Sequence, residues 1–556
     1  MDTPSSPLKP EVLVIGLDGA TFDVIEPLVA RGQLPNIARL LQQGARGKLR
    51  STIPPYSAAA WTTFLTGLNP GHHGVSGFTE FDPQSYQCHP RGRYTDESRL
   101  LLGMLNAAGK RVGCIGMPMT HPPIPVDGFL VPGFDAPSLG RDAIYPPEIF
   151  DQAADLLEPL TLHAGAQPGG VAHIAPVLEE ITRIGDLALR LQALLPCDCL
   201  IVVFPETDHV GHREISSFDP HAAEHPLVRT YIALDEAVGR LLDELASETT
   251  TVVLVSDHGM IPVRAVIDLD ATFRQLGLQF DRNDAAGRRR ASLRRFLRAA
   301  KGGLVSIGLA GLVDWATRRR GLTNAISQLN PARPDNVDWT RTRAFPITWD
   351  GQVRLNLVGR ERDGCVPASQ LATVRDEVIG LLRSATGPDG AALFQQVLTA
   401  EDAYGTDLIG EGPDILLVPR TGYDLKASRD SIGWQGGMLT DAAVAVSTET
   451  TRTGASGMHA PDGILVWCSP HTPAGSAPEG ASLQDMAPTL LYAAGVSVPA
   501  GLDGRVLEEL FAPDFRAARP VQFHEATSEG LPRERSAYSE AEEAVIEDRL
   551  RDLGYM

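Results

Sequence analysis

The sequence predicts an α/β fold with a mostly parallel central sheet, helices on both faces and an inserted cap. Short runs of β-branched and other apolar residues alternate along the chain with longer amphipathic segments. This alternation is typical of parallel strands joined by helical crossovers. The short runs are apolar throughout, as expected for strands that are covered on both faces of a sheet. The alternation stops after about residue 262, where a basic stretch follows.

The first elements of the predicted core are a strand, a helix and a second strand. Residues 12–17 (VLVIGL) form an apolar run ending at Asp18-Gly19, which predicts a buried strand. Proline near the first turn, apolar residues on one face and Gly44 at the end predict a helix over 35–43. Residues 112–116 (VGCIG) predict the next strand.

Two longer helices alternate with two further strands before residue 262. An amphipathic pattern covers about 171–195 and precedes the apolar run 199–204 (CLIVVF). A second stripe of apolar residues over 226–246 precedes the run 251–256 (TVVLVS). These segments continue the alternation, so we expect both strands to lie in the same parallel sheet.

The second half of the chain adds a hairpin, later strands and helices. The run 345–359 (FPITWDGQVRLNLVG) contains Asp350-Gly351, a pair typical of a hairpin turn. We further expect strands at 415–418 and 464–467, a capped helix at 482–495, and a charged amphipathic helix in the tail after Ser536.

The predicted domains are a discontinuous catalytic core, a cap and a tail. We place the core at 11–262 and 345–512, the cap at 263–344 and the tail at 513–556. Residues 281–320 hold 11 Lys/Arg and 3 Asp/Glu. This excess favours an inserted cap with a solvated basic face; the alternative is a surface that attracts a phosphorylated substrate or an anionic membrane. The apolar run 302–316 is too short to span a bilayer and contains an aspartate.

Composition excludes several classes of protein. The 556 residues carry a net charge of −20, which argues against stable nucleic-acid binding because that needs a basic face. No uncharged apolar run reaches the ~18 residues of a membrane span, and the polar start of the chain lacks a signal-peptide core. We therefore expect a cytoplasmic protein. None of the six cysteines forms a C-x-x-C pair, so we expect reduced thiols; Cys197-Asp-Cys199 would make only a weak metal site.

Six side chains that commonly bind metal ions follow predicted strands or lie in a glycine-rich loop. They are Asp18, Asp208, His212, Asp257, His258 and His459. Asp208 and His212 are four residues apart, so a helical turn would place both on one face. Asp257 and His258 are adjacent, so both can serve one ion only if the chain turns there, and Gly259 permits a turn.

Each of these residues alone could be a turn residue or a packed histidine. Their common position is more informative, because open α/β sheets bind ligands at the carboxyl ends of their strands. Three aspartates and three histidines that converge there would form two sites with nitrogen and oxygen ligands, able to hold a phosphoryl group between two metal ions.

Ser57 lies in the stretch PPYSAAAWTTFLTG, between two prolines and a run of alanines. Serine is a favoured N-cap, and residues 58–65 form a plausible helix, so capping is one interpretation. The other is that Ser57 is a nucleophile whose pKa is lowered by a metal ion, next to helix-end N–H groups that suit a phosphate. With six potential metal ligands elsewhere in the chain, we favour the nucleophile.

The motifs of this chain resemble those of the alkaline phosphatase superfamily, in its type I phosphodiesterase/nucleotide pyrophosphatase branch. The similarity is greatest to bacterial members described as predicted phosphohydrolases or phosphomutases. It is carried, in order, by VIGLDG, LPNIARLLQQGARG, STIPPYSAAAWTTFLTGLNPGHHGV, TDHVGH, VSDHGM and SGMH. The resemblance implies an alkaline-phosphatase-like sheet and covers most of the chain; residues 263–344 match least.

The resemblance also implies roles for individual residues. One metal would be bound by Asp208, His212 and His459, and the other by Asp18, Asp257 and His258. Ser57 would be the nucleophile and would touch the second metal. Zinc is the usual ion in this branch, and manganese serves some mutase relatives. His73 of the N-P-G-H-H-G motif would support the site rather than bind metal.

Two positions depart from related enzymes. Sulfatases carry proline and arginine two and four residues after the modified residue; here Ala59 and Trp61 stand there, which argues against sulfatase chemistry. Nucleotide pyrophosphatases carry an asparagine three residues after the nucleophile, where this chain has Ala60. Loss of such a donor costs about 10²–10³ in rate unless another group replaces it. Thr62 and Thr63 are candidates for this substrate-binding role, as are a backbone N–H group and an arginine of the cap.

These observations lead to a predicted function with two alternatives. We expect a two-metal phosphohydrolase that cleaves a phosphoester through a phosphoserine at Ser57, as a phosphodiesterase or nucleotide pyrophosphatase. The alternatives are a phosphomonoesterase or phosphomutase that uses the same site, and a non-catalytic binding protein. The expected partner is a small phosphorylated substrate, with a nucleotide as one candidate. The sequence leaves the substrate and the oligomeric state open.

Overall fold

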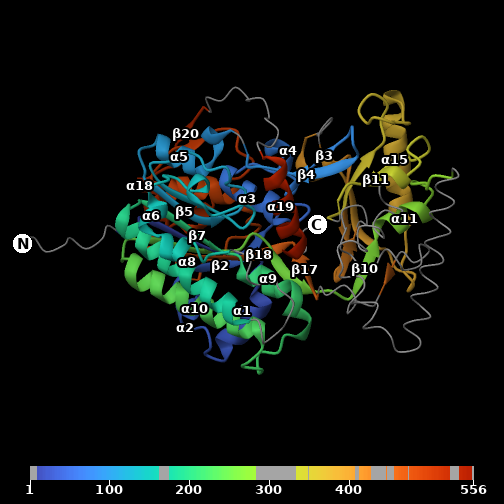
Figure 1. Ribbon diagram of the computed structural model, residues 1–556. Coiled ribbons are helices and arrows are strands. Elements are labelled where there is room, and N and C mark those ends of the chain that lie inside the picture. The colour runs from blue at the N-terminus through green and yellow to red at the C-terminus, as the bar shows by residue number, and fades with distance from the viewer. Residues whose placement is uncertain are drawn as a thin grey trace, which may run out of the picture. The chain divides into compact units, whose positions relative to one another are not determined.

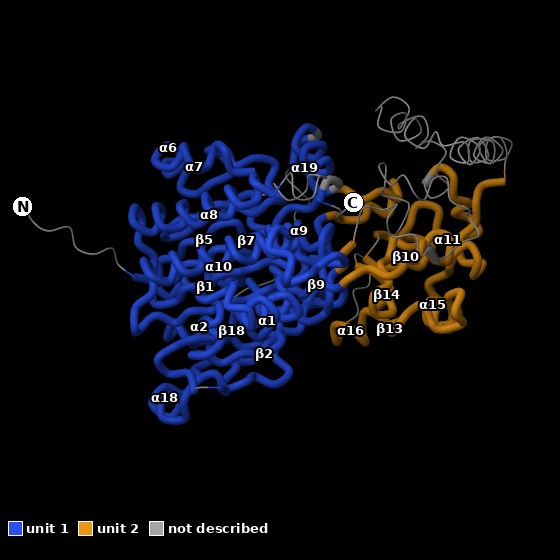
Figure 2. Tube along the Cα trace, turned by 90° about the horizontal axis from the view of Figure 1, so that it is seen from below, with its two compact units in different colours: residues 1–78, 90–261, 459–555 blue, residues 79–89, 262–458, 556 orange. Residues whose placement is uncertain are grey.

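The computed structural model describes residues 9–94, 96–161, 174–283, 334–348, 350–406, 412–426, 446–447, 456–473, 475–525 and 538–553. The chain divides into two compact units, coloured separately in Figure 2. Unit 1 comprises residues 1–78, 90–261 and 459–555, and unit 2 comprises residues 79–89 and 262–458. Most of the basic stretch 281–320, with the whole apolar run 302–316, lies outside the described residues.

Unit 1 is built on a seven-stranded sheet with the strand order β2-β18-β8-β1-β7-β5-β6. The strands are β1 (Val12–Leu17), β2 (Ala45–Arg50), β5 (Val112–Met117), β6 (Gly128–Pro132), β7 (Cys199–Phe204), β8 (Thr251–Val255) and β18 (Asp462–Cys468). All neighbours pair in parallel except β18, which runs antiparallel to both β8 and β2. The mostly parallel sheet predicted from the apolar runs is confirmed.

Helices cover both faces of this sheet, as Figure 1 shows. One face packs on α8 (Ile174–Leu194) and α10 (Pro226–Leu245). The other face packs on α3 (Ser57–Thr66), α5 (Leu101–Ala107) and α17 (Met486–Ala493). Alternate strand residues supply the two faces, because successive side chains of a strand point in opposite directions. Val12 and Val14, for example, belong to the core under α3.

The smaller helices of unit 1 include α1 (Phe22–Ala30), α2 (Pro35–Gln43), α9 (Glu206–Glu214) and, in the tail, α19 (Glu540–Leu553). Of these, the sequence predicted α2 and the tail helix, whereas α1 was not anticipated and α9 only as a helical turn. Proline at the start of α2 and Gly44 at its end match the sequence signals. Among the described residues, no helix is long and apolar enough to cross a membrane. All six cysteines are unpaired, and three of them are buried.

Unit 2 has its own four-stranded sheet, in the order β11-β12-β14-β13. Its strands are β11 (Ala344–Pro346), β12 (Gln352–Leu355), β13 (Phe394–Thr399) and β14 (Ile415–Pro419), and α15 (Leu371–Ser384) packs on them. The predicted hairpin is present: β11 and β12 are antiparallel, and Gly351 turns with φ of 92°.

The contacts divide the chain differently from the predicted domains. Residues 345–458, which the sequence placed with the core, lie in unit 2 together with the cap, because their strands pair with one another and share a separate apolar core. The short segment 79–89 also belongs to this unit.

Candidate metal centre

Three neighbouring strands of unit 1 deliver the predicted ligands to one edge of the sheet. β1 lies between β7 and β8. Its last residue, Leu17, pairs with Phe204 at the end of β7, so Asp18 and the start of α9 lie at the same edge. The chain after β8 turns at Ser256–His258 before β9 (Gly259–Pro262) begins. The prediction that the ligands meet at the carboxyl ends of these strands is thus met by the geometry.

Glycine is needed after this turn for a different reason from the one that the sequence suggested. Gly259 has no left-handed backbone conformation. A Cβ atom on Gly259 would instead lie 2.3 Å from the carbonyl oxygen of Asp462 on β18. Glycine is therefore required here by the close approach of another strand rather than by the bend itself.

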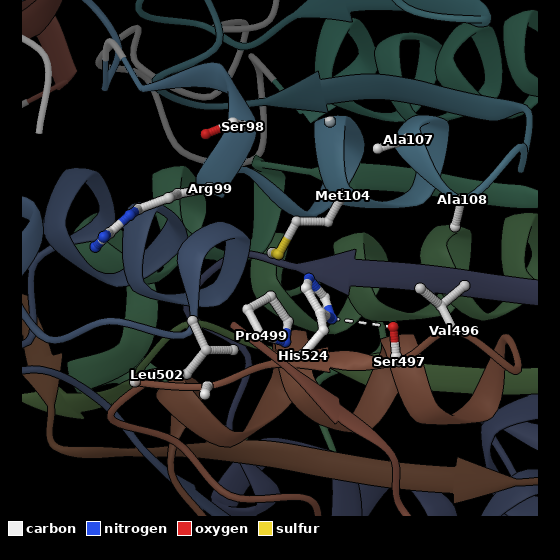
Figure 3. A pocket seen from close by; sticks show the side chains of 13 residues that line it. Ser98, Arg99, Met104, Ala107, Ala108, Val496, Ser497, Pro499, Leu502 and His524 are labelled. Carbon is white, nitrogen blue, oxygen red and sulfur yellow. Dashed lines mark hydrogen bonds between the residues drawn. The ribbon is translucent and has the colours of Figure 1, made fainter. Parts of the chain in front are cut away.

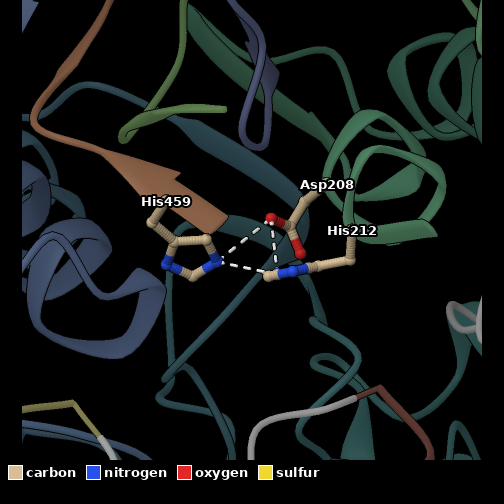
Figure 4. Close-up of side chains that lie close together, drawn as sticks. All are labelled: Asp208, His212 and His459. Carbon is tan, nitrogen blue, oxygen red and sulfur yellow. Dashed lines mark hydrogen bonds and ion pairs between the residues drawn. The ribbon is translucent and has the colours of Figure 1, made fainter. Parts of the chain in front are cut away.

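One group of ligand atoms consists of Asp208, His212 and His459 (Figure 4). Asp208 and His212 lie one turn apart on α9, and His459 lies on β17 (Gly457–Ala460). Asp208 Oδ1 is 3.3 Å from His212 Nε2 and 3.2 Å from His459 Nε2, and the two nitrogens are 2.9 Å apart. Tetrahedral coordination with bonds of about 2.0 Å separates ligand atoms by about 3.3 Å. The three atoms therefore fit the coordination shell of one small divalent ion.

A second group consists of Asp18, Asp208 and His258, all fully buried. His258 Nε2 is 3.6 Å from Asp18 Oδ1 and 4.0 Å from Asp208 Oδ1. Asp257 joins this group, because its Oδ2 lies 3.4 Å from the same nitrogen. Asp208 is thus common to both groups, whereas the family resemblance assigned it to the first alone.

In Asp18 and Asp257, one carboxylate oxygen accepts a hydrogen bond from the protein and the other does not. Asp18 Oδ2 accepts a hydrogen bond of 2.9 Å from Trp61 Nε1, and Asp257 Oδ1 accepts one of 3.1 Å from the backbone N–H of Gly19. Asp18 Oδ1 and Asp257 Oδ2 are buried and accept no hydrogen bond among the described residues. Buried carboxylate oxygens without a donor are costly unless a cation binds them.

Two of the histidines are oriented in the same way by backbone carbonyls. His258 Nδ1 lies 3.0 Å from the oxygen of Gly259, and His459 Nδ1 lies 2.8 Å from the oxygen of Pro55. A carbonyl oxygen only accepts, so each Nδ1 carries a proton and each Nε2 is the nitrogen that faces the ligand cluster. This is the form in which a histidine binds a metal, with its other nitrogen held by an outer partner.

The charges of the site favour a bound cation. Burial and the neighbouring carboxylates of Asp257 and Asp208 raise the pKa of Asp18 well above its usual value. Burial also raises the pKa of Asp257. Burial opposes ionisation of Asp208 too, but His212 and His459 outweigh it and hold the pKa of Asp208 well below its usual range. Burial and His459 lower the pKa of His258, which stays neutral. Divalent cations would let all three carboxylates ionise together.

Ser57 does not cap the helix that it begins. Tyr56 is the N-cap residue of α3, no side chain caps this end, and Ser57 is the first helical residue. Its Oγ lies 3.1 Å from His258 Nε2 and is fully buried. Because Nε2 has a lone pair, the hydroxyl donates to it. The structure therefore separates the two interpretations of Ser57: its side chain faces the ligand cluster.

Thr62 and Thr63 have partners inside the unit. Thr62 Oγ1 donates to the carbonyl of Ala58 one turn earlier, and Thr63 Oγ1 lies 2.9 Å from His73 Nε2. His73 Nδ1 accepts from the backbone N–H of Val75, so its Nε2 donates to Thr63. His73 thus fixes α3, in keeping with a supporting role. A role of the two threonines in substrate binding stays a prediction.

Two neighbours of the cluster were not anticipated from the sequence. Trp61 donates to Asp18, and its spacing of four residues from Ser57 on a helix is the one signal that could have indicated a shared face. Phe134, on the loop after β6, packs edge-on against His209 with ring centroids 5.3 Å apart. His209 directly follows Asp208. No local pattern predicts this second contact, because it joins separate loops.

A separate pocket of about 290 Å³ lies between α5 and the short pair β19 (Val498–Pro499) and β20 (Phe523–His524), as Figure 3 shows. Met104, Val496 and Leu502 give it an apolar lining, and His524 Nδ1 lies 3.0 Å from Ser497 Oγ at its side. None of the predicted site residues lines this pocket. The cluster at the ends of β1, β7 and β8 therefore remains the candidate catalytic site.

Comparison with known proteins identifies the family of the chain. The family described as "Type I phosphodiesterase / nucleotide pyrophosphatase" matches residues 12–438. A search of curated proteins finds no match. Among solved structures, phosphonoacetate hydrolase from Sinorhizobium meliloti 1021, in complex with phosphonoformate, has a TM-score of 0.52 at 15% identity, over 88% of this chain and 96% of that one.

A second similar structure is human ectonucleotide pyrophosphatase/phosphodiesterase 5. It has a TM-score of 0.48 at 13% identity, over 90% of this chain and 99% of that one. At such identities a structural likeness shows no more than a fold, and the first of the two agrees with the α/β architecture described above. The family match spans most of the chain, including every predicted ligand except His459. The chain belongs to the type I phosphodiesterase/nucleotide pyrophosphatase family, and it is a phosphoric ester hydrolase.

Proposed function

We propose that this protein is a two-metal phosphodiesterase or pyrophosphatase that forms a phosphoserine at Ser57. The observation that carries the proposal is the position of Ser57 Oγ, 3.1 Å from His258 Nε2 and next to two groups of converging ligand atoms. The proposed substrate is a small phosphodiester or pyrophosphate, with nucleotides as candidates. We propose that the enzyme acts in the cytoplasm.

The ligand set favours two divalent ions. Asp208, His212 and His459 would hold one, and Asp18, Asp257 and His258 the other, with Asp208 Oδ1 near both. Neutral imidazole nitrogens with carboxylate oxygens suit zinc, and manganese accepts the same ligands. When bound, the ions would neutralise phosphoryl oxygens and lower the pKa of the serine hydroxyl.

The side chains supply two displacement steps. Ser57 Oγ loses its proton to solvent and attacks phosphorus. The bond from Oγ to phosphorus forms as the bond from phosphorus to the leaving oxygen breaks, and that oxygen takes up a proton. A water molecule then attacks phosphorus from the opposite side. The serine bond breaks, and Ser57 regains a proton.

A monoesterase or phosphomutase is the second candidate, because of the environment of Ala60. Its methyl group is fully buried in the apolar core beside Trp61 and Phe64, so position 60 offers no donor to a substrate oxygen. Relative rates on bis-(4-nitrophenyl) phosphate and 4-nitrophenyl phosphate separate the candidates. A strong preference for the monoester would contradict the diesterase proposal, and transfer to a second hydroxyl of the substrate would indicate a mutase.

The decisive experiment replaces Ser57 by alanine. We expect Ser57→Ala to lose at least about 10³-fold in turnover, because the attacking atom is gone, and to keep its metal content. Ser51→Ala is the matched control, since Ser51 is a buried serine on the same approach to α3. Quenching the wild type during turnover should reveal a phosphorylated peptide that contains Ser57. Near-normal activity of Ser57→Ala would overturn the proposal.

A further inference from the structure

Trp61 connects the helix of the nucleophile to a metal ligand on another strand. It lies one turn after Ser57 on α3 and is fully buried. Its indole Nε1–H donates to Asp18 Oδ2 at 2.9 Å. Asp18 follows β1, so this hydrogen bond joins residues 43 positions apart in the sequence.

The bond distinguishes the two oxygens of Asp18. Oδ2 is occupied by the indole, whereas Oδ1 is buried, accepts no hydrogen bond among the described residues, and lies 3.6 Å from His258 Nε2. A carboxylate without such a donor rotates about χ2 between two nearly equivalent orientations, and it can present either oxygen or both. With Oδ2 held, Oδ1 alone faces the ligand atoms of the second group.

Packing gives the indole a fixed place. Gly16 of β1 makes room for the ring, because a Cβ atom on Gly16 would lie 2.9 Å from Trp61 Cη2. On the other side, Phe64 packs edge-on, with ring centroids 5.5 Å apart. Close-packed aromatic rings rarely change rotamer, so the N–H stays directed at Asp18.

The choice of residue type at this position is also informative. A lysine or arginine could donate the same hydrogen bond, but its positive charge would neutralise Asp18 and compete with a metal ion. The indole N–H is uncharged and only donates. It can therefore orient a carboxylate while leaving the charge of that carboxylate for a cation.

We propose that Trp61 is a positioning residue that orients Asp18 so that it binds its metal ion through Oδ1 alone. Trp61 thereby fixes the position of the ion relative to the helix that carries Ser57. The inference rests on the proposed function in one respect, the assignment of Asp18 as a metal ligand. An outer partner of this kind contributes about 10–100-fold to metal affinity.

The test compares two buried tryptophans. Trp61→Phe removes the N–H donor, and Trp467→Phe is the matched control. Trp467 is equally buried, on β18, and its Nε1 has no hydrogen-bond partner among the described residues. A second variant at position 61 carries a tryptophan analogue in which sulfur replaces the indole N–H, so that the shape is kept and the donor is lost. Thermal unfolding of each variant checks that it folds.

The readout is the equilibrium binding of Zn²⁺, and separately of Mn²⁺, measured by competition with a chromophoric chelator. We expect two ions in the wild type, and a loss of about 10–100-fold in affinity for one of them in both Trp61 variants. We expect Trp467→Phe to bind both ions as the wild type does. Equal binding by the folded sulfur variant and the wild type would overturn the inference, as would an equal loss in Trp467→Phe.

This design separates failure of the inference from failure of the proposed function. If the wild type binds two ions and Ser57→Ala is inactive, unchanged binding in the Trp61 variants contradicts the positioning role alone. If the wild type binds neither Zn²⁺ nor Mn²⁺, the assignment of Asp18 as a ligand fails together with the inference.

Discussion

Two buried clusters of charged residues, one in each unit, differ in how their charges are balanced. The cluster in unit 1 contains Asp18, Asp208 and Asp257, whose basic neighbours are histidines. Asp18 Oδ1 and Asp257 Oδ2 in this cluster are buried without a hydrogen bond among the described residues. The cluster in unit 2 also lies in the interior, but arginines match its carboxylates.

In the cluster of unit 2, groups of the protein itself donate hydrogen bonds to both carboxylates. Glu361 Oε1 accepts from Arg354 at 3.0 Å and from Arg360 at 2.8 Å, and its Oε2 accepts from the backbone N–H of Leu357. Asp414 receives two hydrogen bonds from Arg360, at 2.9 and 2.7 Å. Two positive charges thus meet two negative ones, and both carboxylates have donors.

The difference shows which cluster is structural and which is built for a ligand. A buried ion cluster with matched charges requires no bound ion. Removing one of its members lowers the free energy of unfolding. A buried cluster with excess negative charge and free lone pairs is costly by itself and is expected where an external cation completes it. Changes in the two clusters should therefore move stability in opposite directions.

The largest effect is expected for Asp18→Asn. We expect activity to fall by at least about 10²–10³-fold and one metal ion to be lost, because the charge of a ligand is gone. We also expect the melting temperature in excess chelator to rise, since an ionisable carboxyl group is removed from a buried position beside two other carboxyl groups. Assays with an aryl phosphate ester, metal analysis and calorimetry measure these effects. Asp23→Asn, at an exposed position, is the control; a fall in the melting temperature of chelated Asp18→Asn would contradict the comparison.

The next effect is expected in unit 2, with the opposite sign. Glu361→Gln leaves the buried Arg354 without its counter-charge, so we expect a loss of about 3–5 kcal/mol in the free energy of unfolding. Metal content and the kcat of the folded protein should stay unchanged. Glu377→Gln, which removes an exposed pair with Arg343, should cost less than about 1 kcal/mol. Equal costs for the two variants in denaturant titrations would show that the buried cluster is not structural.

A smaller, pH-dependent effect is expected for Asp135, beside Phe134. Burial raises the pKa of Asp135 to about 6, even though its Oδ2 accepts from the backbone N–H of Met119 and Arg549 is nearby. The folded protein then holds more protons than the unfolded chain between about pH 4 and pH 6, so this group makes stability fall as the pH rises through that window. The shift of about 2 pKa units corresponds to at most about 3 kcal/mol.

Replacing Asp135 by asparagine removes this dependence. We expect Asp135→Asn and the wild type to have similar melting temperatures at pH 4, and the variant to be more stable at pH 8. The exposed Asp243→Asn should show no such difference between the two pH values. A variant that is less stable than the wild type at pH 8 would mean that Asp135 is ionised and well solvated in the fold.

The smallest effect is expected for Thr63→Val on α3. The substitution removes the hydrogen bond to His73, which should cost about 1–2 kcal/mol in the free energy of unfolding. Thr62→Val removes a bond within the helix and should cost less. Near-native kcat in both variants would mean that neither hydroxyl supplies the missing phosphate donor. A fall of about 10²-fold in one of them would identify that donor.

Much of the unit 1 fold could be predicted from the sequence because buried parallel strands leave long apolar runs. Residues 12–17, 199–204 and 251–256 form strands within one residue of their predicted ends. The candidate ligands Asp18, Asp208 and His258 could be anticipated because each follows one of these strands. The order of the strands in the sheet could not be predicted, since it depends on which face of the sheet each connecting helix covers.

The sequence was less informative where contacts join distant segments. The placement of 345–458 in unit 2 depends on the pairing of strands that no local pattern specifies. The shared position of Asp208 between two ligand groups, the donation from Trp61 and the close approach of Asp462 to Gly259 are likewise long-range. Such contacts are set by packing, and periodicity within a segment does not reveal them.

The hydrogen bond between His459 and the carbonyl of Pro55 affects how the site can change over time. Its acceptor belongs to the main chain, so every amino acid at position 55 would supply the same oxygen. Exchange of that side chain alone therefore leaves the orientation of His459 untouched, unless the backbone path moves. A survey of point mutants would score position 55 by its effect on the shape of the loop and would miss its role as an acceptor. The orientation of His459 therefore depends on the backbone conformation at position 55 and not on which amino acid stands there.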